Sequence, residues 1–169
     1  MPNLLVTDAN ILIDLGDTNN HQVLFLEGTS VYTTHEVMGE LLGVQAQGWQ
    51  TYITAGRLSV VEADEATTAR IRQEAAQRLS DVDCTVLALA IDKTAILVSG
   101  DQLIVKHYRR QGHEAHGILW LLDQHEAART LVESELYHIL GSIMAINSWL
   151  PARECNRRMR RWGEVKNEG

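Results

Sequence analysis

Short apolar segments alternate with longer segments of helical character along the first two-thirds of this 169-residue chain. The apolar segments lie at residues 4–7, 31–33, 58–61, 94–99 and, as a short fifth one, 115–117. Apolar runs of this length predict buried strands, and a helix between successive strands implies a crossover connection. Parallel strands joined in this way form a sheet that helices cover on both faces. The pattern therefore predicts an α/β fold, a three-layer α/β/α sandwich with a central parallel sheet of four to five strands.

The predicted helices follow the strands and continue to the end of the chain. One opens with the Thr-x-x-Glu spacing of a capping box at Thr33 and Glu36 and is expected to run to about Ala46. Others are predicted at 64–79, from Ser80 onward, and at 101–110, 118–128, 130–147 and 151–162. No repeat or Pro/Ser-rich linker interrupts the sequence. Residues 1–169 are therefore expected to form one domain, with 118–169 as its C-terminal helical extension.

The composition is that of a soluble globular protein, with 45% hydrophobic and 22% charged residues. No run of about 18 apolar residues exists, so no membrane-spanning helix is expected. The first residues lack the basic segment and cleavage site of a secretory signal. Without sign of an oxidising compartment, Cys84 and Cys155 are expected to be free thiols, and the cytoplasm is the expected location.

The formal net charge of −7 excludes a protein that coats nucleic acid by electrostatic attraction alone. It is compatible with a nuclease whose acidic cleft is neutralised by metal ions. Positive charge collects in a basic tail near the end of the chain, at Arg153, Arg157, Arg158, Arg160, Arg161 and Lys166. Such a tail can contact phosphates or an acidic partner, or it can be the solvated face of a helix, and the sequence favours neither interpretation.

Four carboxylates are expected to meet at one edge of the sheet. Two predicted strands end in Asp8 and Asp101, Asp83 begins the helix before the fourth strand, and Glu40 lies in the helix after the second. Ligands of an open parallel sheet bind outside the carboxyl ends of its strands. Clustered carboxylates repel one another unless cations bind, and their oxygens suit Mg²⁺ or Mn²⁺. Such cations activate water and stabilise in-line displacement at phosphorus, so phosphodiester hydrolysis is the predicted chemistry.

Each carboxylate also has a purely structural interpretation. Asp83 completes a Ser80-x-x-Asp capping arrangement, and Asp101 can cap the helix that follows it. Glu40, taken alone, is most typical of a surface glutamate. Asp8, directly after an apolar strand, is the least easily explained in this way. The structural interpretations do not predict four acids at strand ends, so the joint pattern favours a site.

Four segments resemble the motifs of PIN domains, in the order that this family has them. They are Val-Thr-Asp8-Ala-Asn10-Ile-Leu, Glu36-Val-Met-Gly-Glu40-Leu-Leu, Ser80-Asp-Val-Asp83-Cys-Thr-Val-Leu-Ala and Leu97-Val-Ser99-Gly-Asp101-Gln-Leu. The resemblance covers the first two-thirds of the chain. It implies a ribonuclease that depends on Mg²⁺ or Mn²⁺ and cuts single-stranded RNA. Many such domains are VapC-type toxins, so the resemblance also implies an antitoxin protein as a partner.

The resemblance assigns a role to each matching residue. The catalytic, metal-binding carboxylates are Asp8, Glu40, Asp83 and Asp101. Asn10 and Ser99 are second-layer groups that orient these carboxylates. Asp81 is the alternative to Asp83, because it lies two residues earlier and also at the start of the helix. Asp14, one turn beyond Asn10, is expected to be a surface acid.

The chain continues past these motifs with helices that resemble a longer subgroup of PIN domains rather than a compact toxin. Their apolar residues are expected to pack on each other and on the sheet, with a surplus that favours a homodimer. These residues include Leu119, Trp120, Leu136, Ile139, Ile143 and Trp149. The tryptophans, Trp162 among them, are expected to pack in the core or an interface rather than to stack on bases.

Two other functions remain compatible with the sequence. A catalytically inactive PIN-like binding module would act through its C-terminal helices and basic tail, but it would have no reason to keep all four acids. An aspartate-based phosphatase would use Asp8 as the phosphate acceptor. It would also require an aspartate at position 10, where Asn10 stands. A zinc site is not expected, because the seven histidines lack the spacing of a ligand set.

Overall fold

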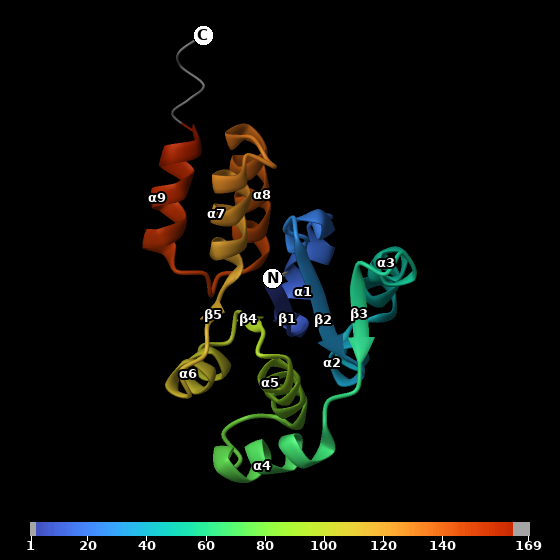
Figure 1. Cartoon of the computed structure of the whole chain (residues 1–169). Helices are drawn as coiled ribbons and strands as arrows, with labels where there is room; N and C mark the ends of the chain where they lie inside the picture. The colour runs from blue at the N-terminus through green and yellow to red at the C-terminus, as the bar shows by residue number, and fades with distance from the viewer. Residues whose placement is uncertain (1–2, 164–169) are drawn as a thin grey trace.

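A parallel sheet forms the centre of the computed structural model, which describes residues 3–163 (Figure 1). Within this range the sheet has five strands, in the order β3-β2-β1-β4-β5. They are β1 (Asn3–Thr7), β2 (Thr29–Thr34), β3 (Leu58–Val61), β4 (Ile96–Val98) and β5 (Ala115–His116). The predicted α/β class, with parallel strands in a three-layer sandwich, is confirmed.

Helices connect the strands and cover both faces of the sheet. They are α1 (Ala9–Asp17), the 3-10 helix η1 (His21–Leu24), α2 (His35–Glu40), α3 (Gly43–Thr54), α4 (Glu65–Ala75), α5 (Asp81–Lys93), α6 (Gln102–Arg110), α7 (Ile118–Ala128), α8 (Glu133–Ile146) and α9 (Ala152–Gly163). Helix α5 packs across β1, β2 and β4, with α4 and α6 beside it. Helix α1 packs against α3, η1 and α8.

The central strand β1 is the first in the sequence, and it pairs with β2 on one side and β4 on the other. Leu5 and Val6 are fully buried, because strands flank them and helices cover them. All strands run toward the end of the molecule that carries α4, at the bottom of Figure 1. The residues that follow β1 and β4 therefore emerge side by side at this carboxyl edge.

The predicted helix from Thr33 is wrong in two respects. The N-cap is Thr34, whose hydroxyl accepts the backbone N–H of Val37 at 3.2 Å. Thr33 instead belongs to β2, and its hydroxyl donates to the carbonyl of Thr7 at 2.8 Å. The helix also ends at Glu40, where Leu41 turns extended, and α3 begins after it rather than continuing the same helix. Sheet pairing explains the first error, because Thr33 must be extended to reach β1.

Two further boundaries differ from the sequence expectation. Helix α4 ends at Ala75 rather than at residue 79, because Ala76 and Gln77 have left-handed backbone conformations (φ 48° and 66°) that end a helix. The predicted helix at 130–147 begins three residues later, at Glu133. The remaining strands and helices begin and end within about three residues of their predicted positions, as expected for fraying ends.

The C-terminal helices bury most of the apolar residues that suggested association. Leu136 and Ile143 are completely buried, Ile139 is nearly so, and Trp162 packs in the core. Trp149 is the exception at 93% exposed, so it does not pack in the core, and the interface position expected for it stays a prediction. Cys84 and Cys155 are free thiols and are buried. Between residues 3 and 163 there is no helix of the length and apolar character that crossing a membrane requires.

Candidate functional site

Asp8 lies at the centre of the carboxyl edge, between the end of β1 and the start of α1. It is the N-cap of α1, and its Oδ1 accepts the backbone N–H of Ile11 at 3.3 Å. Only 5% of the residue is exposed. Burial, together with the smaller effect of the carboxylates of Asp83 and Asp101, raises the pKa of Asp8 to about 7, against the lowering effect of its hydrogen bonds. A buried carboxylate of this kind lacks a compensating positive charge.

Ser99 connects Asp8 to the end of the neighbouring strand. Its hydroxyl donates to Oδ2 of Asp8 and accepts the backbone N–H of Asp101 at 3.0 Å. Because the single hydroxyl proton is directed to Asp8, the two bonds are compatible and fix the orientation of both groups. Ser99 is 1% exposed. The second bond, to Asp101, could not be anticipated from the spacing of the motif.

Asp101 and Asp83 lie at the starts of two helices on the same side of the sheet. Asp101 is the N-cap of α6, and its Oδ1 accepts the N–H of Leu103 at 2.8 Å. Asp83 forms a capping box with Ser80, whose N–H it accepts at 3.2 Å. Burial raises the pKa of Asp83, the bonds with Ser80 lower it, and the charge of Asp101 raises it. Both aspartates thus have the structural role that the sequence suggested, at positions that also face the other acids.

Glu40 is the last residue of α2 and is exposed. Burial of its carboxyl is modest, yet it raises the pKa of Glu40, and the charge of Asp83 adds to this. Asp83 therefore interacts with Glu40 on one side and with Asp8 and Asp101 on the other. The four predicted carboxylates form one electrostatically connected group.

The other residues singled out from the sequence lie at different distances from this group. Asp81 is exposed and pairs with Arg72 at 2.7 Å, and it is not among the groups that shift the pKa of Asp8, Glu40 or Asp83. Asn10 is exposed on the first turn of α1, with its Cβ 3.8 Å from the position that a Cβ on Gly100 would take. Asp14 is half-buried rather than a simple surface acid, because its Oδ2 accepts the side-chain amide of Asn147 at 2.6 Å.

A row of buried threonines ties the strand ends together beneath the carboxylates. The hydroxyl of Thr7 donates to the carbonyl of Val98 at 3.2 Å, and Thr33 donates to Thr7. Thr34 pairs with Thr85 of α5 at 3.1 Å. These side chains position β2, β1, β4 and α5 relative to one another. Sequence reasoning missed their role, although the threonines at the ends of β1 and β2 were a visible signal.

Charge and chemistry of the group fit a divalent cation, although the side chains are not arranged as a closed shell. Hard carboxylate oxygens are the ligands that Mg²⁺ and Mn²⁺ prefer, and the buried Asp8 lacks a counter-charge. Among the residues that the structure describes, no three His, Cys, Asp or Glu side chains lie close enough together to hold a metal ion. The caps explain this, since Asp83 and Asp101 turn their oxygens to backbone N–H groups.

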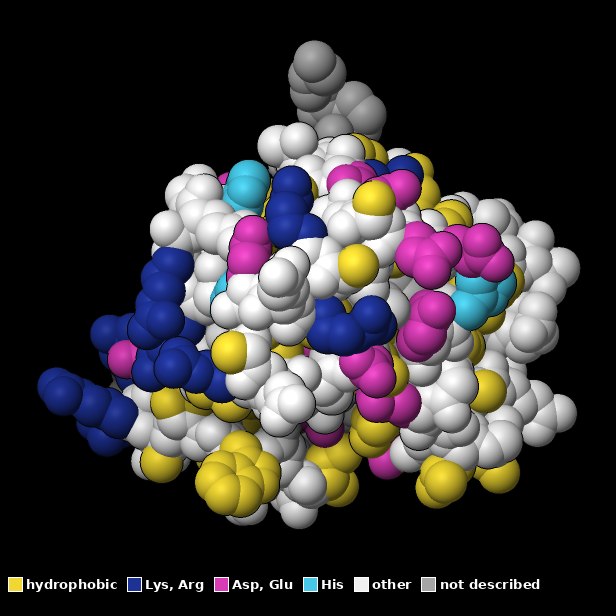
Figure 2. Space-filling model, turned by 90° about the horizontal axis from the view of Figure 1, so that it is seen from below, with side chains coloured by type: hydrophobic (Ala, Val, Ile, Leu, Met, Phe, Trp, Pro, Cys, Tyr) yellow, Lys and Arg dark blue, Asp and Glu magenta, His cyan; other side chains and the backbone are white. Residues whose placement is uncertain are grey.

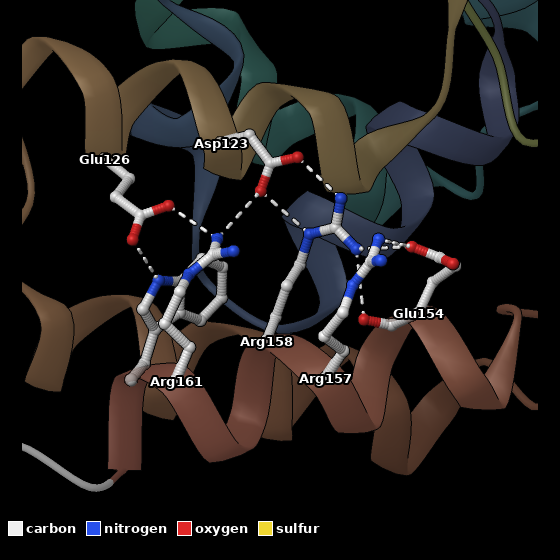
Figure 3. A network of polar contacts seen from close by, with 7 residues as sticks. Asp123, Glu126, Glu154, Arg157, Arg158 and Arg161 are labelled. Carbon is white, nitrogen blue, oxygen red and sulfur yellow. Dashed lines mark hydrogen bonds and ion pairs between the residues drawn. The ribbon is translucent and has the colours of Figure 1, made fainter.

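Three arginines of the basic tail are held by acids of this chain rather than free for phosphate binding. Arg158, with only 12% of its side chain exposed, donates to both oxygens of Asp123 on α7, at 2.8 and 2.6 Å. Arg161 donates to Glu126 at 2.6 Å, and the indole N–H of Trp162 donates to the same carboxylate at 2.9 Å. Figure 3 shows these side chains crossing from α9 to α7. The arginines attach the last helix to the body of the domain.

A third arginine of the tail, Arg157, pairs with Glu154 on its own helix. Its side chain is 65% exposed, so this pair is a surface contact of small energy. Lys166, which the sequence analysis counted in the tail, lies outside the described residues. Neither of the two interpretations weighed for the tail anticipated intramolecular pairing with α7.

A family model described as a PIN domain matches residues 4–164. The matched range contains all four carboxylates and extends through the C-terminal helices to the end of α9. A search of curated proteins finds no match.

Proposed function

Because this chain belongs to the PIN-domain family and has its nuclease-type fold, we propose that it is a metal-dependent endoribonuclease acting on single-stranded RNA. The observation that carries the proposal is the buried carboxyl of Asp8, which Ser99 orients and which shares its electrostatic environment with Asp83 and Asp101. Placing an uncompensated carboxylate at the carboxyl edge of a parallel sheet is costly unless a cation binds there.

In this proposal Asp8, Glu40, Asp83 and Asp101 hold Mg²⁺ or Mn²⁺. A bound divalent cation supplies a nucleophilic water at neutral pH and neutralises charge on the phosphate oxygens. The protein's own contribution is to orient the ligands. Ser99 fixes Oδ2 of Asp8, the α1 N-terminus fixes Oδ1, and Asp101 is held through its backbone N–H. The expected products carry a 5′-phosphate and a 3′-hydroxyl, without a covalent intermediate.

The decisive assay measures internal cleavage of single-stranded RNA with Mg²⁺ or Mn²⁺, with and without chelator. Asp8→Asn and Asp101→Asn keep side-chain size and remove a charge, so turnover should fall by roughly a hundredfold or more. Asp14→Asn is the matched control, since Asp14 lies on α1 but bonds Asn147 instead. Cleavage that survives both chelator and Asp8→Asn would contradict the proposal.

The rival binding-module function makes the opposite prediction. An inactive domain would cleave no RNA, and Mg²⁺ or Mn²⁺ would leave its melting temperature unchanged. For the proposed nuclease, metal should raise the melting temperature of wild type and have little effect on Asp8→Asn, because ligands that bind only the folded state stabilise it. The two measurements together separate the functions. The phosphatase alternative has lost its support, because the family match assigns another fold.

A toxin role in a toxin–antitoxin pair is the narrower form of the proposal, with an antitoxin protein as partner. It requires a companion gene, so a short overlapping upstream reading frame is the observation that tests it. Co-expression of that product should then suppress RNA cleavage by the wild-type protein. A gene that stands alone, with no such frame, would leave an active ribonuclease of another role.

A further inference from the structure

A second polar feature lies beside the carboxylates, in a groove between the C-terminal end of α4 and one face of α6. Its volume is about 400 Å³. Residues spaced at three, four and seven positions along α6 line one wall, because these positions share a helix face. The lining side chains include Arg78, Leu79, Leu103, Lys106, His107 and Arg110. Cationic and apolar groups therefore face each other across the groove.

The cations of this groove have no acidic partner in the described part of the chain. No ion pair forms there at Arg78, Lys106 or Arg110, and all three residues are exposed. The one acid that lines the groove, Glu74, pairs with Arg70 at 3.8 Å. These cations contrast with the arginines of α9 that Figure 3 shows in ion pairs.

The location of the positive charge is as informative as its sign. Figure 2 views the carboxyl edge of the sheet, where Lys and Arg side chains are most numerous on the left, with others nearer the middle, and Asp and Glu side chains lie mostly right of the middle. The chain as a whole carries a net charge of −7. Concentrated positive charge on an acidic protein focuses attraction for anions at one place rather than over the whole surface.

Each wall of the groove contains a residue that lies next in sequence to the helix start that holds one of the carboxylates. Leu79 directly precedes Ser80, the residue that forms the capping box with Asp83. On the other wall, the N–H of Leu103 bonds Asp101, and Leu103 is 58% exposed. A polyanion that lies in the groove would thus pass two leucines before it reaches the acids.

We infer that this groove binds the phosphodiester backbone of the RNA strand whose scissile bond enters the carboxylate site, an inference that rests on the proposed ribonuclease function. Arg78, Lys106 and Arg110 contact phosphates, and Leu103 contacts the ribose or base nearest the acids. Lys106 and Arg110 are one helical turn apart, about 5–6 Å between their Cβ atoms, so the two side chains can contact neighbouring phosphates of one strand. The groove selects a chain over a mononucleotide.

The test is RNA binding measured by fluorescence anisotropy with a labelled oligouridylate, in chelator so that the strand stays intact. Lys106→Ala/Arg110→Ala should weaken binding by about tenfold or more, and the plot of log K against log salt should become shallower by about 1.4, or 0.7 for each lost phosphate contact. Arg153→Ala/Arg160→Ala is the matched control, because both arginines are exposed on α9. The control should keep wild-type affinity and slope.

Several outcomes would overturn the inference. One is a double variant that matches wild type in affinity and slope, and another is a wild type that binds no oligouridylate at all. Polyglutamate binding that depends on Lys106 and Arg110, without RNA binding, would assign the groove to an acidic protein segment instead. Thermal melting of each variant checks that the fold is intact.

A cleavage assay on a long RNA with Mg²⁺ tests the proposed nuclease function independently of the binding measurement. If wild type binds RNA through Lys106 and Arg110 but cleaves none, RNA binding by the groove is supported and the proposed nuclease activity is contradicted. If wild type cleaves RNA and the double variant cleaves it at the same rate, the nuclease activity is supported and the role of the groove is contradicted. The two proposals therefore fail in distinguishable ways.

Discussion

The hydroxyl of Ser99 donates to the buried carboxyl of Asp8, from a strand that lies 91 residues further along the chain. The same oxygen accepts the backbone N–H of Asp101 at 3.0 Å. Two of the four acids are therefore held by one small side chain. Removing this hydroxyl should affect the site without affecting the core.

Ser99→Ala should reduce RNA cleavage by about tenfold to a hundredfold, since a hydrogen bond to a charged group contributes about 1.5–3 kcal/mol. The concentration of Mg²⁺ needed for half-maximal cleavage should rise, because the bond also lowers the pKa of Asp8 and so favours its ionised form. A metal titration at constant RNA measures both effects. Ser59→Ala, in β3, is the control and should change neither quantity. An unchanged titration for Ser99→Ala would contradict the role of Ser99 in positioning Asp8.

Metal-free protein should lose stability as pH rises. Burial raises the pKa of Asp8 from 3.8 to about 7, so folding favours the protonated carboxyl. The resulting stabilisation is complete below the unfolded pKa and is lost as pH rises through about 7, with a total on the order of a few kcal/mol. Asp8→Asn should show much less of this loss. Denaturant unfolding in chelator at about pH 5 and about pH 8 measures the free energy of unfolding of each protein. An equal change in this free energy between the two pH values for wild type and Asp8→Asn would contradict the prediction.

Arg158→Met should destabilise the domain by about 1–3 kcal/mol, because the half-buried Asp123 loses both short bonds with Arg158 and keeps only the 3.5 Å contact with Arg161. Arg157→Met is the matched control on the same helix and should change stability by less than about 0.5 kcal/mol, since its ion pair is exposed. Thermal melting compares the two. RNA cleavage should be unchanged in both variants. Loss of cleavage with intact folding would instead indicate that the arginine of the tail contributes to substrate binding.

Self-association is expected through the turn between α8 and α9. Trp149 is 93% exposed and Ile146 50% exposed, whereas most other apolar residues of these helices are buried. Trp149→Ser should convert a symmetric dimer into a monomer without loss of folding. Light scattering at micromolar concentration tests this expectation. A monomeric wild type would remove it, and the exposed tryptophan would then need another partner.

The alternation of apolar runs and helices was sufficient to predict the sheet, because burial on both faces leaves a clear signature in sequence. The cap at Thr34 was missed for a physical reason. Thr33 and Thr34 are both competent caps, and only pairing with β1 decides which one remains extended. The end of α2 at Glu40 was likewise invisible, since the residues that follow have ordinary helix propensity.

The carboxylates show why structural and functional interpretations of one residue need not compete. Asp83 and Asp101 each cap a helix, and each also raises the pKa of Asp8. Sequence could suggest both roles but not their coexistence, which depends on where the helix starts lie in space. The pairing of Arg158 with Asp123 was out of reach, because it joins two helices whose packing no local pattern specifies.

The separation of 91 residues between Asp8 and Ser99 has a consequence for the timing of synthesis. Translation proceeds at about 5–20 residues per second, so Asp8 is synthesised roughly 5–20 s before Ser99. During that interval β1 can pair with β2 but not with β4, and the acids after β4 do not yet exist. The four carboxylates of the proposed site can therefore come together only after more than half of the chain has been translated.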